Sequence, residues 1–328
     1  MKALAALGYG PAQDLKVIDL PVPTAGPGQI QVRIAAATIN PTDMRVFTGE
    51  YKDLLPVEFP YILGTDFAGT VTQVGAGVDR YTIGDEVFGQ ALPRQLRSVT
   101  AGVDRPSLST GTLAEYTVFE ADTPLLARRP ASVTVEQAAA LAISGMTTRA
   151  ILKIAAMERG QTALVIGATG GVGTSLLPAL AAGGIHTIAT VSSAEKGALA
   201  TRLGANELIG HDPIGYPGDV DVVFNLALFA DRIGEAAKSL KAGGKMVSIM
   251  FPPATPADLR RDDVDFHFML DMDGTYGGMR DVAEAAAAGN LTVEIGQMFP
   301  FERAVEAAIA YQAASSPGKI VVAFPTAE

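Results

Sequence analysis

The chain has 328 residues, of which 48% are hydrophobic and 18% charged, so we expect a globular protein of about two domains. A net charge of −10 and the lack of a lysine- and arginine-rich run argue against a nucleic-acid partner or an anionic membrane surface. The absence of cysteine excludes disulfides, thiolate metal sites and a cysteine nucleophile.

The N-terminal segment Met1–Leu7 imitates a signal peptide, but its apolar run is too short for one and ends at Gly8. We therefore predict a first strand here. No apolar run approaches the length of a membrane span, so we expect a cytoplasmic protein with no membrane partner.

Residues 1–125 have the pattern of a β-rich region. Apolar and polar residues alternate in Gln29–Ile34, which predicts a strand with one buried face. Residues 40–43 are expected to break this strand and to start a short helix. Residues 91–109 are polar and irregular, and we expect a mobile loop.

After Val135 the pattern changes to alternating helices and strands, which predicts a parallel sheet covered on both faces. The predicted helices cover residues 136–141, 147–157, 230–241, 279–288 and 302–312. The predicted strands cover residues 163–166, 187–191, 220–224, 245–250, 264–270, 293–299 and 319–324.

A glycine-rich turn follows the predicted strand at 163–166 and precedes a helix. A turn this tight needs backbone angles that a Cβ disfavours, and a bound pyrophosphate needs side-chain-free access to amides at a helix N-terminus. Gly170 and Gly173 match the second and third glycines of the dinucleotide fingerprint, and Ala168 replaces the first. The strand–turn–helix–strand context favours a dinucleotide site over an ordinary glycine turn. The residues predicted to bind here are Ala168, Gly170, Gly171, Val172 and Gly173.

The residues after the second strand of this unit bear on the choice of dinucleotide. NAD-preferring sites carry an acid there, whereas this chain has Ser192, Ser193 and Lys196, which suit a 2′-phosphate. We therefore predict NADPH as the cofactor, with Glu195 as the opposing observation. The alternative is that Ser193 only caps a helix and that Lys196 is a solvated surface charge.

Pro178 falls within the helix that follows the glycine turn. Because proline removes a helical hydrogen bond and crowds the preceding turn, we predict a kink or an early 3₁₀ turn there.

Seven segments occur in the order of one known family: residues 28–34, 40–43, 49–51, 63–69, 84–87, 168–173 and 318–320. They resemble the medium-chain dehydrogenase/reductase superfamily, and the nearest subfamily is similar to the zinc-independent quinone oxidoreductases that include zeta-crystallin. The resemblance implies a GroES-like catalytic domain in residues 1–125, a Rossmann NADP-binding domain in 126–270 and a C-terminal segment, 271–328, that completes the catalytic domain. It also implies a homodimer with sheets joined edge to edge.

The chain departs from zinc-dependent relatives, which place cysteine where Asn40 stands and histidine where Thr65 stands. A catalytic zinc needs about three nitrogen, sulfur or oxygen ligands around one point. The histidines His186, His211 and His267 lie far apart in the sequence, so no metal site is expected. His211 falls where quinone oxidoreductases carry a tyrosine near the NADP phosphate.

By position, the resemblance implies that Tyr51 is a proton donor or an orienting hydroxyl, with packing of its ring as the open alternative. It also implies that Asn40 and Asp43 lie in the active site and that Asn40 contacts the nicotinamide. For both, a turn and helix cap is the alternative. Arg45 stands where some members have tyrosine. The remaining implied cofactor contacts are Thr147, Asn225, Met250, Phe251 and Lys319.

The resulting prediction is an NADPH-dependent reductase that transfers hydride to a quinone or to an α,β-unsaturated carbonyl. Without zinc, such acceptors suit bare hydride transfer because their developing negative charge is delocalised. The choice between them stays open. An NADPH-binding structural or sensing protein with little catalysis is the alternative hypothesis, and the fold alone does not separate the two.

Overall fold

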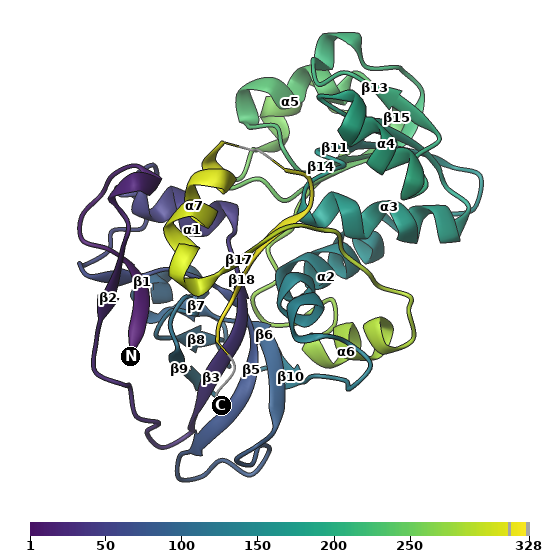
Figure 1. Ribbon diagram of the computed structural model, residues 1–328. Helices are drawn as coiled ribbons and strands as arrows, with labels where there is room; N and C mark the ends of the chain where they lie inside the picture. The colour runs from purple at the N-terminus through teal and green to yellow at the C-terminus, as the bar shows by residue number, and fades with distance from the viewer. Residues whose placement is uncertain (314–315, 326–328) are drawn as a thin grey trace. The chain divides into compact units, whose positions relative to one another are not determined.

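The computed structural model describes residues 1–313 and 316–325, and it divides the chain into two compact units (Figure 1). Unit 1 comprises Met1–Ile143, Met272–Gly289 and Ile295–Glu328, and unit 2 comprises Ser144–Asp271 and Asn290–Glu294. The sequence predicts breaks after residues 125 and 270, whereas the two units change at 143/144 and 271/272. Residues 314–315 and 326–328, within the predicted C-terminal segment, lie outside the described part.

Unit 1 is rich in β-structure. In its larger sheet, β3 (Gln29–Thr38) pairs antiparallel with β5 (Asp66–Val74), β9 (Tyr116–Glu120) and β18 (Lys319–Ala323). The C-terminal strand β18 therefore lies beside β3, from near the start of the chain. The other strands of this sheet are β6 (Glu86–Gln90), β7 (Leu92–Pro93), β8 (Leu108–Ser109), β10 (Leu126–Arg128) and β17 (Ile295–Pro300).

Unit 1 also contains a smaller sheet, three α-helices, short 3₁₀ helices and the first part of α2 (Val135–Ala155). Residues Phe67 and Phe119 stack within its core, with ring centres 4.0 Å apart. The smaller sheet has the order β2 (Lys16–Asp19), β1 (Lys2–Ala6), β4 (Tyr61–Ile62). The helices are α1 (Pro41–Phe47), α6 (Met279–Ala287) and α7 (Ala304–Gln312).

Unit 2 is built on a parallel sheet whose order is β13-β12-β11-β14-β15-β16. The chain starts in the middle at β11, moves outward through β12 and β13, and then returns to β14 on the other side. Helices connect the strands, as expected for a doubly wound sheet. The strands are β11 (Thr162–Ile166), β12 (His186–Thr190), β13 (Glu207–Ile209), β14 (Val220–Asn225), β15 (Leu240–Ser248) and β16 (Asp265–Phe268), and the helices are α3 (Gly171–Gly183), α4 (Ala194–Arg202) and α5 (Ala230–Ala237).

The core of unit 2 explains why these apolar runs form strands. Leu164, Val223 and Met246 come from three neighbouring strands and are fully buried. They are covered by residues of α5 such as Ile233. Because both faces of a parallel sheet are buried, its strands are continuous apolar runs, as the sequence shows.

Helix α2 (Val135–Ala155) is long and apolar enough to cross a membrane by length and composition alone. The expectation that no apolar run approaches that length is therefore wrong. However, 67% of its most apolar stretch is buried inside the protein, and buried core helices meet the same criteria. The helical segments predicted at 136–141 and 147–157 are parts of this one helix.

The structure corrects three further expectations. Helix α3 is α-helical through Pro178, so the predicted 3₁₀ turn is wrong. An internal proline costs roughly 3 kcal/mol. Burial of Leu176, Leu177 and Leu180 contributes about 1.5–3 kcal/mol for each side chain, and the sum outweighs that cost. Residues 91–109 are not irregular throughout, since they contain β7, β8 and a 3₁₀ helix at Arg94–Thr100. The predicted helix at 230–241 ends at Ala237 because β15 begins at Leu240.

Candidate active site

The turn between β11 and α3 has the geometry of a phosphate-binding loop. Gly167 has φ +86°, which favours glycine, and its amide donates to Thr190 Oγ1 at the end of β12, at 3.1 Å. Gly170 is the N-cap residue of α3, and it makes no side-chain capping hydrogen bond at this end of the helix. A Cβ at Gly170 would have only the Gly167 carbonyl oxygen nearby, at 3.5 Å, so the space beside it is open.

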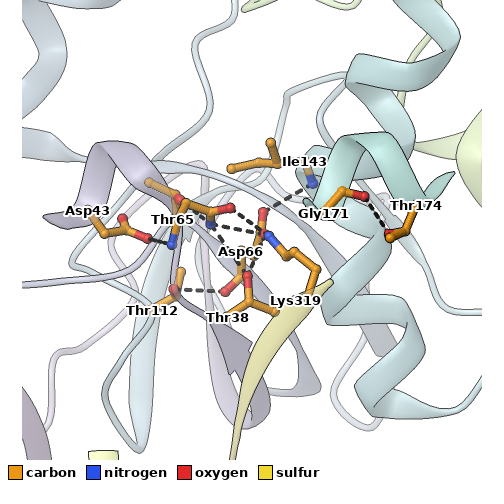
Figure 2. A network of polar contacts seen from close by, with 10 residues as sticks. Thr38, Asp43, Thr65, Asp66, Thr112, Ile143, Gly171, Thr174 and Lys319 are labelled. Carbon is orange, nitrogen blue, oxygen red and sulfur yellow. Dashed lines mark hydrogen bonds and ion pairs between the residues drawn. The ribbon is translucent and has the colours of Figure 1, made fainter. Parts of the chain in front are cut away.

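Gly173 is glycine for a different reason. A Cβ at this position would lie 2.4 Å from the carbonyl oxygen of Ala168, because α3 packs closely against the turn. Thr174 Oγ1 donates to the Gly171 carbonyl at 3.0 Å and reinforces the same turn (Figure 2). The amides at the N-terminus of α3 lack helical acceptors and can bind an anion.

Helix α2 contributes to this loop as well. Thr148 Oγ1 donates to the Val172 carbonyl at 3.5 Å, and the predicted contact residue Thr147 is its half-buried neighbour. Neither Thr148 nor Thr190 lies in the glycine pattern, so the sequence alone gives no sign of their contacts with this turn.

The residues after β12 form the predicted 2′-phosphate site. Ser192 and Ser193 are exposed, and Ser193 Oγ accepts a hydrogen bond from the Lys196 amide at 3.2 Å, so it caps α4. The pKa of His211 is lowered by burial and by the nearby positive charge of Lys196. Lys196 and His211 are therefore near enough for the charge of one to act on the other, and the prediction that both bind the 2′-phosphate stays a prediction.

Asn225 ends β14 and is fully buried. Its Nδ2 donates to the Leu228 carbonyl at 2.8 Å and to Ser248 Oγ at 3.1 Å, and its Oδ1 accepts from the Leu228 amide at 2.8 Å. The side-chain amide of Asn225 thus holds the backbone of the loop after β14 in place. The half-buried pair Met250-Phe251 follows β15, and the Met250 amide donates to Ser248 Oγ at 3.3 Å.

These features of unit 2 fit a dinucleotide. The predicted contacts follow the carboxyl ends of β11, β12, β14 and β15, and parallel strands bring those ends to one edge of the sheet. The strand order reverses between β11 and β14, which is where doubly wound sheets bind ligands. The open space beside Gly170, where a Cβ would meet only the Gly167 carbonyl oxygen at 3.5 Å, supplies the independent structural observation.

Unit 1 contains a buried polar network that the sequence analysis did not foresee (Figure 2). Lys319 Nζ on β18 donates to Asn40 Oδ1 at 2.5 Å and to Asp66 Oδ2 at 2.8 Å. The Lys319 side chain is 6% exposed and the Asp66 side chain 0%. A buried ion pair of this kind needs further hydrogen bonds to offset the loss of hydration.

Asp66 receives these further hydrogen bonds. Thr38 Oγ1 donates to Asp66 Oδ2 at 2.6 Å, and the Ile143 amide donates to Oδ1 at 3.1 Å. Asn40 Nδ2 also donates to Asp66 Oδ2, at 3.1 Å, and to Thr65 Oγ1, at 3.2 Å. The predicted cofactor contact Lys319 is thus paired inside unit 1, and its role toward the cofactor stays a prediction.

Asp43 lies beside this network on α1 and is buried. Its Oδ2 accepts a hydrogen bond from the Asn40 amide at 2.8 Å, so the predicted helix cap is present. Its Oδ1 has no hydrogen-bond partner among residues 1–313 and 316–325. Burial, and to a lesser degree the negative charge of Asp66, raises the pKa of Asp43 to about 7.

Tyr61 is a second buried group beside Asp43. Its hydroxyl also lacks a partner within the described part of the chain. Burial and the charge of Asp43 raise the pKa of Tyr61 well above its usual value. Both buried polar atoms therefore lack a hydrogen-bond partner among the described residues, and the charge of Asp43 acts on Tyr61.

Tyr51 lies in the segment that follows α1 and is 5% exposed. Arg45 Nη1, in the last turn of α1, donates to Tyr51 Oη at 2.9 Å. The Tyr51 hydroxyl therefore has a charged hydrogen-bond partner. The alternative hypothesis, that Tyr51 only packs its ring, requires no such partner. The sequence analysis noted Arg45 only as a departure from related proteins.

The structure brings the predicted residues together within each unit. Asn40, Asp43 and Lys319 share one network in unit 1, and Arg45 and Tyr51 follow on the same segment. Within the described ranges, no group of three or more histidine, cysteine, aspartate or glutamate side chains could hold a metal ion.

Two family profiles match the chain. Residues 26–130 match the alcohol dehydrogenase GroES-like domain, and residues 203–322 match a zinc-binding dehydrogenase domain. The first match lies within unit 1, and the second includes much of the parallel sheet of unit 2.

Curated proteins and solved structures match over longer ranges. An NADPH-dependent alkenal/one oxidoreductase from Arabidopsis thaliana is 29% identical over 98% of this chain and 79% of its own length. A quinone oxidoreductase from Rattus norvegicus is 29% identical over 76% and 73%, and dehydrogenase orsE from Emericella nidulans is 32% identical over 74% and 68%. A mycobacterial structure solved with NADPH is 25% identical, covers 98% of this chain and 99% of its own, and has a TM-score of 0.81.

Proposed function

The chain belongs to the medium-chain dehydrogenase/reductase superfamily, and from this we propose that it is an NADPH-dependent reductase of quinones or of α,β-unsaturated carbonyl compounds. The predicted fold, a GroES-like domain with a Rossmann-type parallel sheet, is confirmed. The protein is an oxidoreductase, and its relatives reduce quinones and alkenals or enones.

NADPH is the cofactor, and the single observation in this chain that carries dinucleotide binding is the loop at Gly170. Its open backbone and the amides of α3 would hold the pyrophosphate. Ser192, Ser193, Lys196 and His211 would hold the 2′-phosphate, since hydroxyl, ammonium and imidazolium groups all donate to phosphate oxygens. When bound, NADPH supplies the hydride and its two electrons to the acceptor.

Residues of the chain would supply the proton that the reduced acceptor needs. An acceptor that gains hydride becomes an enolate or a hydroquinone anion, so it needs a proton from the protein or from water. Tyr51 carries a hydroxyl with a cationic partner, which suits it for that proton transfer. Asp43, with a pKa of about 7, can hold or release a proton near neutrality. The backbone amide of Asn40 donates to the Asp43 carboxyl and fixes its position.

We also propose that the reaction proceeds without zinc, although one matching family profile is named for zinc. The residues of the network do not fit a zinc ion. They are an amide, hydroxyls and a carboxylate already paired with the Lys319 ammonium, and that positive charge would repel a metal ion. Dialysis against a chelator should therefore leave turnover unchanged.

A homodimer in the cytoplasm, without a membrane or nucleic-acid partner, completes the proposal. Strand β16 is at an edge of the sheet in unit 2 and pairs with β15. An unpaired edge is a surface to which a second copy can add its own edge strand. Light scattering of the purified protein would measure the mass and decide between monomer and dimer.

The function is tested by following NADPH oxidation with a benzoquinone, a naphthoquinone and a simple enone, beside NADH and a Tyr51→Phe variant. We expect turnover with at least one acceptor, a clear preference for NADPH and a large loss of turnover in the variant. Tight NADPH binding without turnover of any acceptor would instead favour a binding or sensing protein.

A further inference from the structure

The carboxyl ends of β14 and β15 are joined by a hydrogen bond between two buried side chains. Asn225 is the last residue of β14 and Ser248 the last residue of β15, and they are 0% and 1% exposed. The two residues are aligned partners in the parallel pairing of these strands. Asn225 Nδ2 donates to Ser248 Oγ at 3.1 Å, so the bond joins the two points at which the chain leaves the sheet.

The side-chain amide of Asn225 is fully used by these contacts. The two hydrogens of Nδ2 go to Ser248 Oγ and, at 2.8 Å, to the Leu228 carbonyl. Oδ1 accepts from the amides of Ala227 and Leu228 at 3.3 Å and 2.8 Å. An asparagine amide has two donor hydrogens and two acceptor lone pairs, so this one has no capacity left for a hydrogen bond to a ligand.

Ser248 Oγ serves both segments that leave the sheet. Besides the Asn225 amide, it accepts from the backbone amide of Met250 at 3.3 Å, in the segment after β15. The Ile249 amide also donates to the Asn225 carbonyl, at 3.2 Å. One hydroxyl oxygen therefore helps to set the spacing between the loop at 226–229 and the segment that begins at residue 249.

The loop at 226–229 in turn lies against the glycine turn before α3. The Leu226 amide donates to the carbonyl of Ile166, the last residue of β11, at 3.0 Å. A Cβ at Gly167 would lie 3.1 Å from the Cβ of Ala227. A shift of this loop would therefore change the edge of the sheet beside the proposed pyrophosphate turn.

The strand order divides this edge into two sides. Strand β12 is on one side of β11, and β14 and β15 are on the other. A doubly wound sheet built from two mononucleotide-binding halves binds a dinucleotide across the point where its order reverses. Because the residues proposed for the 2′-phosphate follow β12, the adenosine half belongs on that side. The segments after β14 and β15 then remain for the nicotinamide half.

We propose that Ser248 is a positioning residue for the nicotinamide half of NADPH. Its hydroxyl oxygen holds the loop at 226–229 and the Met250-Phe251 segment at the spacing that receives this half of the cofactor. Asn225 acts in the same way, through the loop that its amide holds. This inference rests on the proposed function, because it takes NADPH as the ligand of this sheet.

The test is calorimetric titration of the full chain with two probes. NADPH carries both halves, whereas adenosine 2′,5′-bisphosphate carries the 2′-phosphate but lacks the nicotinamide half. Ser248→Ala removes the acceptor, and Ser248→Cys keeps the size of the side chain but offers only a weakly accepting sulfur. Ser239→Ala is the matched control, because Ser239 is also 1% exposed but precedes the opposite end of β15. Circular dichroism shows that each variant folds.

We expect both Ser248 variants to bind NADPH about 10-fold more weakly than wild type, because buried donors lose their acceptor. Their affinity for adenosine 2′,5′-bisphosphate should stay within about 2-fold of wild type, which a general loss of structure would not allow. Ser239→Ala should leave both affinities unchanged.

The variant Asn225→Ala and the double variant Asn225→Ala/Ser248→Ala extend the test. Because Asn225 and Ser248 share a hydrogen bond, the loss of NADPH affinity in the double variant should be smaller than the product of the single losses. Losses that multiply would mean that the two residues act independently, which would overturn the inference.

The remaining outcomes separate this inference from the proposed function. If wild type binds NADPH and both Ser248 variants bind it as tightly, or lose affinity for both probes alike, only this inference fails. If wild type binds no NADPH, the proposed function fails and takes the inference with it. Binding without turnover would count against the proposed reductase alone, since the comparison needs no reaction.

Discussion

Asp43 shows at the scale of one residue how burial sets a proton affinity. One carboxyl oxygen is bonded to the Asn40 amide, whereas the other has no partner within the described residues. Burial therefore penalises the charged form and raises the pKa from 3.8 to about 7. The folded protein binds this proton more tightly than the unfolded chain, so the free energy of unfolding falls as pH rises from about 4 to about 7.

The Asp43→Asn variant tests this linkage. An asparagine can still accept from the Asn40 amide but cannot ionise, so it should lack the loss of stability in that pH window. Above about pH 7 the variant should be more stable than wild type, on the order of a few kcal/mol. Urea unfolding at about pH 5 and about pH 8 measures the difference. Equal pH slopes for the two proteins would contradict the account of Asp43.

His211 gives a second prediction at this scale. Its pKa is lowered by burial and by Lys196 in the free protein, and a bound 2′-phosphate would raise it again. Protonation of His211 should therefore strengthen NADPH binding as pH falls. The affinity of wild type relative to His211→Asn should increase from about pH 8 to about pH 6, and the phosphate's own titration cancels in this ratio.

Calorimetric titration measures these affinities, with NADH and His186→Asn as controls. NADH lacks the 2′-phosphate, and His186 is exposed and paired with Glu207 on the neighbouring strand at 2.7 Å. For NADH, the ratio of wild-type to His211→Asn affinity should not change with pH. The His186→Asn variant should show the same pH dependence of NADPH binding as wild type. An NADPH affinity ratio that stays constant with pH would remove His211 from the phosphate site.

At the scale of one element, the turn between β11 and α3 contains two glycines with separable roles. A Cβ at Gly170 would enter open space, whereas a Cβ at Gly173 would lie 2.4 Å from the Ala168 carbonyl oxygen. Gly170→Ala should thus keep the stability of wild type but bind NADPH at least about 10-fold more weakly, as its methyl group would block the pyrophosphate. Gly173→Ala should lower stability itself.

Thermal unfolding and NADPH titration of the two variants distinguish these roles. Gly218→Ala is the control, because a Cβ there meets nothing within 4 Å and Gly218 precedes the start of β14, away from the carboxyl ends of the strands. If Gly170→Ala bound NADPH as wild type does, the loop would not be the pyrophosphate site. Unchanged stability in Gly173→Ala would mean that α3 can shift away from the turn.

The same elements show what the sequence could and could not predict. The spacing of Gly170 and Gly173 reflects local backbone requirements, so β11, the turn and the start of α3 were predictable to within a residue. Pro178 was misjudged because the preference of one residue is local, whereas the leucines of α3 gain their stability from tertiary burial. Helix ends such as that of α5 depend on where the next strand begins.

At the scale of the whole molecule, the sequence does not show which distant strands pair with each other. Lys319 and Asp66 are 253 residues apart, and they meet because β18 pairs with β3 beside β5. Lysine is usually exposed, so no local pattern identifies it as a buried partner of a carboxylate. The residue pattern at 40–43 predicted the helix start and cap that Asn40 and Asp43 form, but only the fold shows the network that Asn40 joins.

Hydride transfer from NADPH to an electron-poor acceptor is the central step of the proposed function. The most direct measurement uses NADPH deuterated at the transferring position of the nicotinamide, on either face, with an enone acceptor in ordinary water. We expect a saturated product with deuterium at its β-carbon and none at its α-carbon. Product without deuterium from either labelled form, or no product although NADPH is bound, would contradict it.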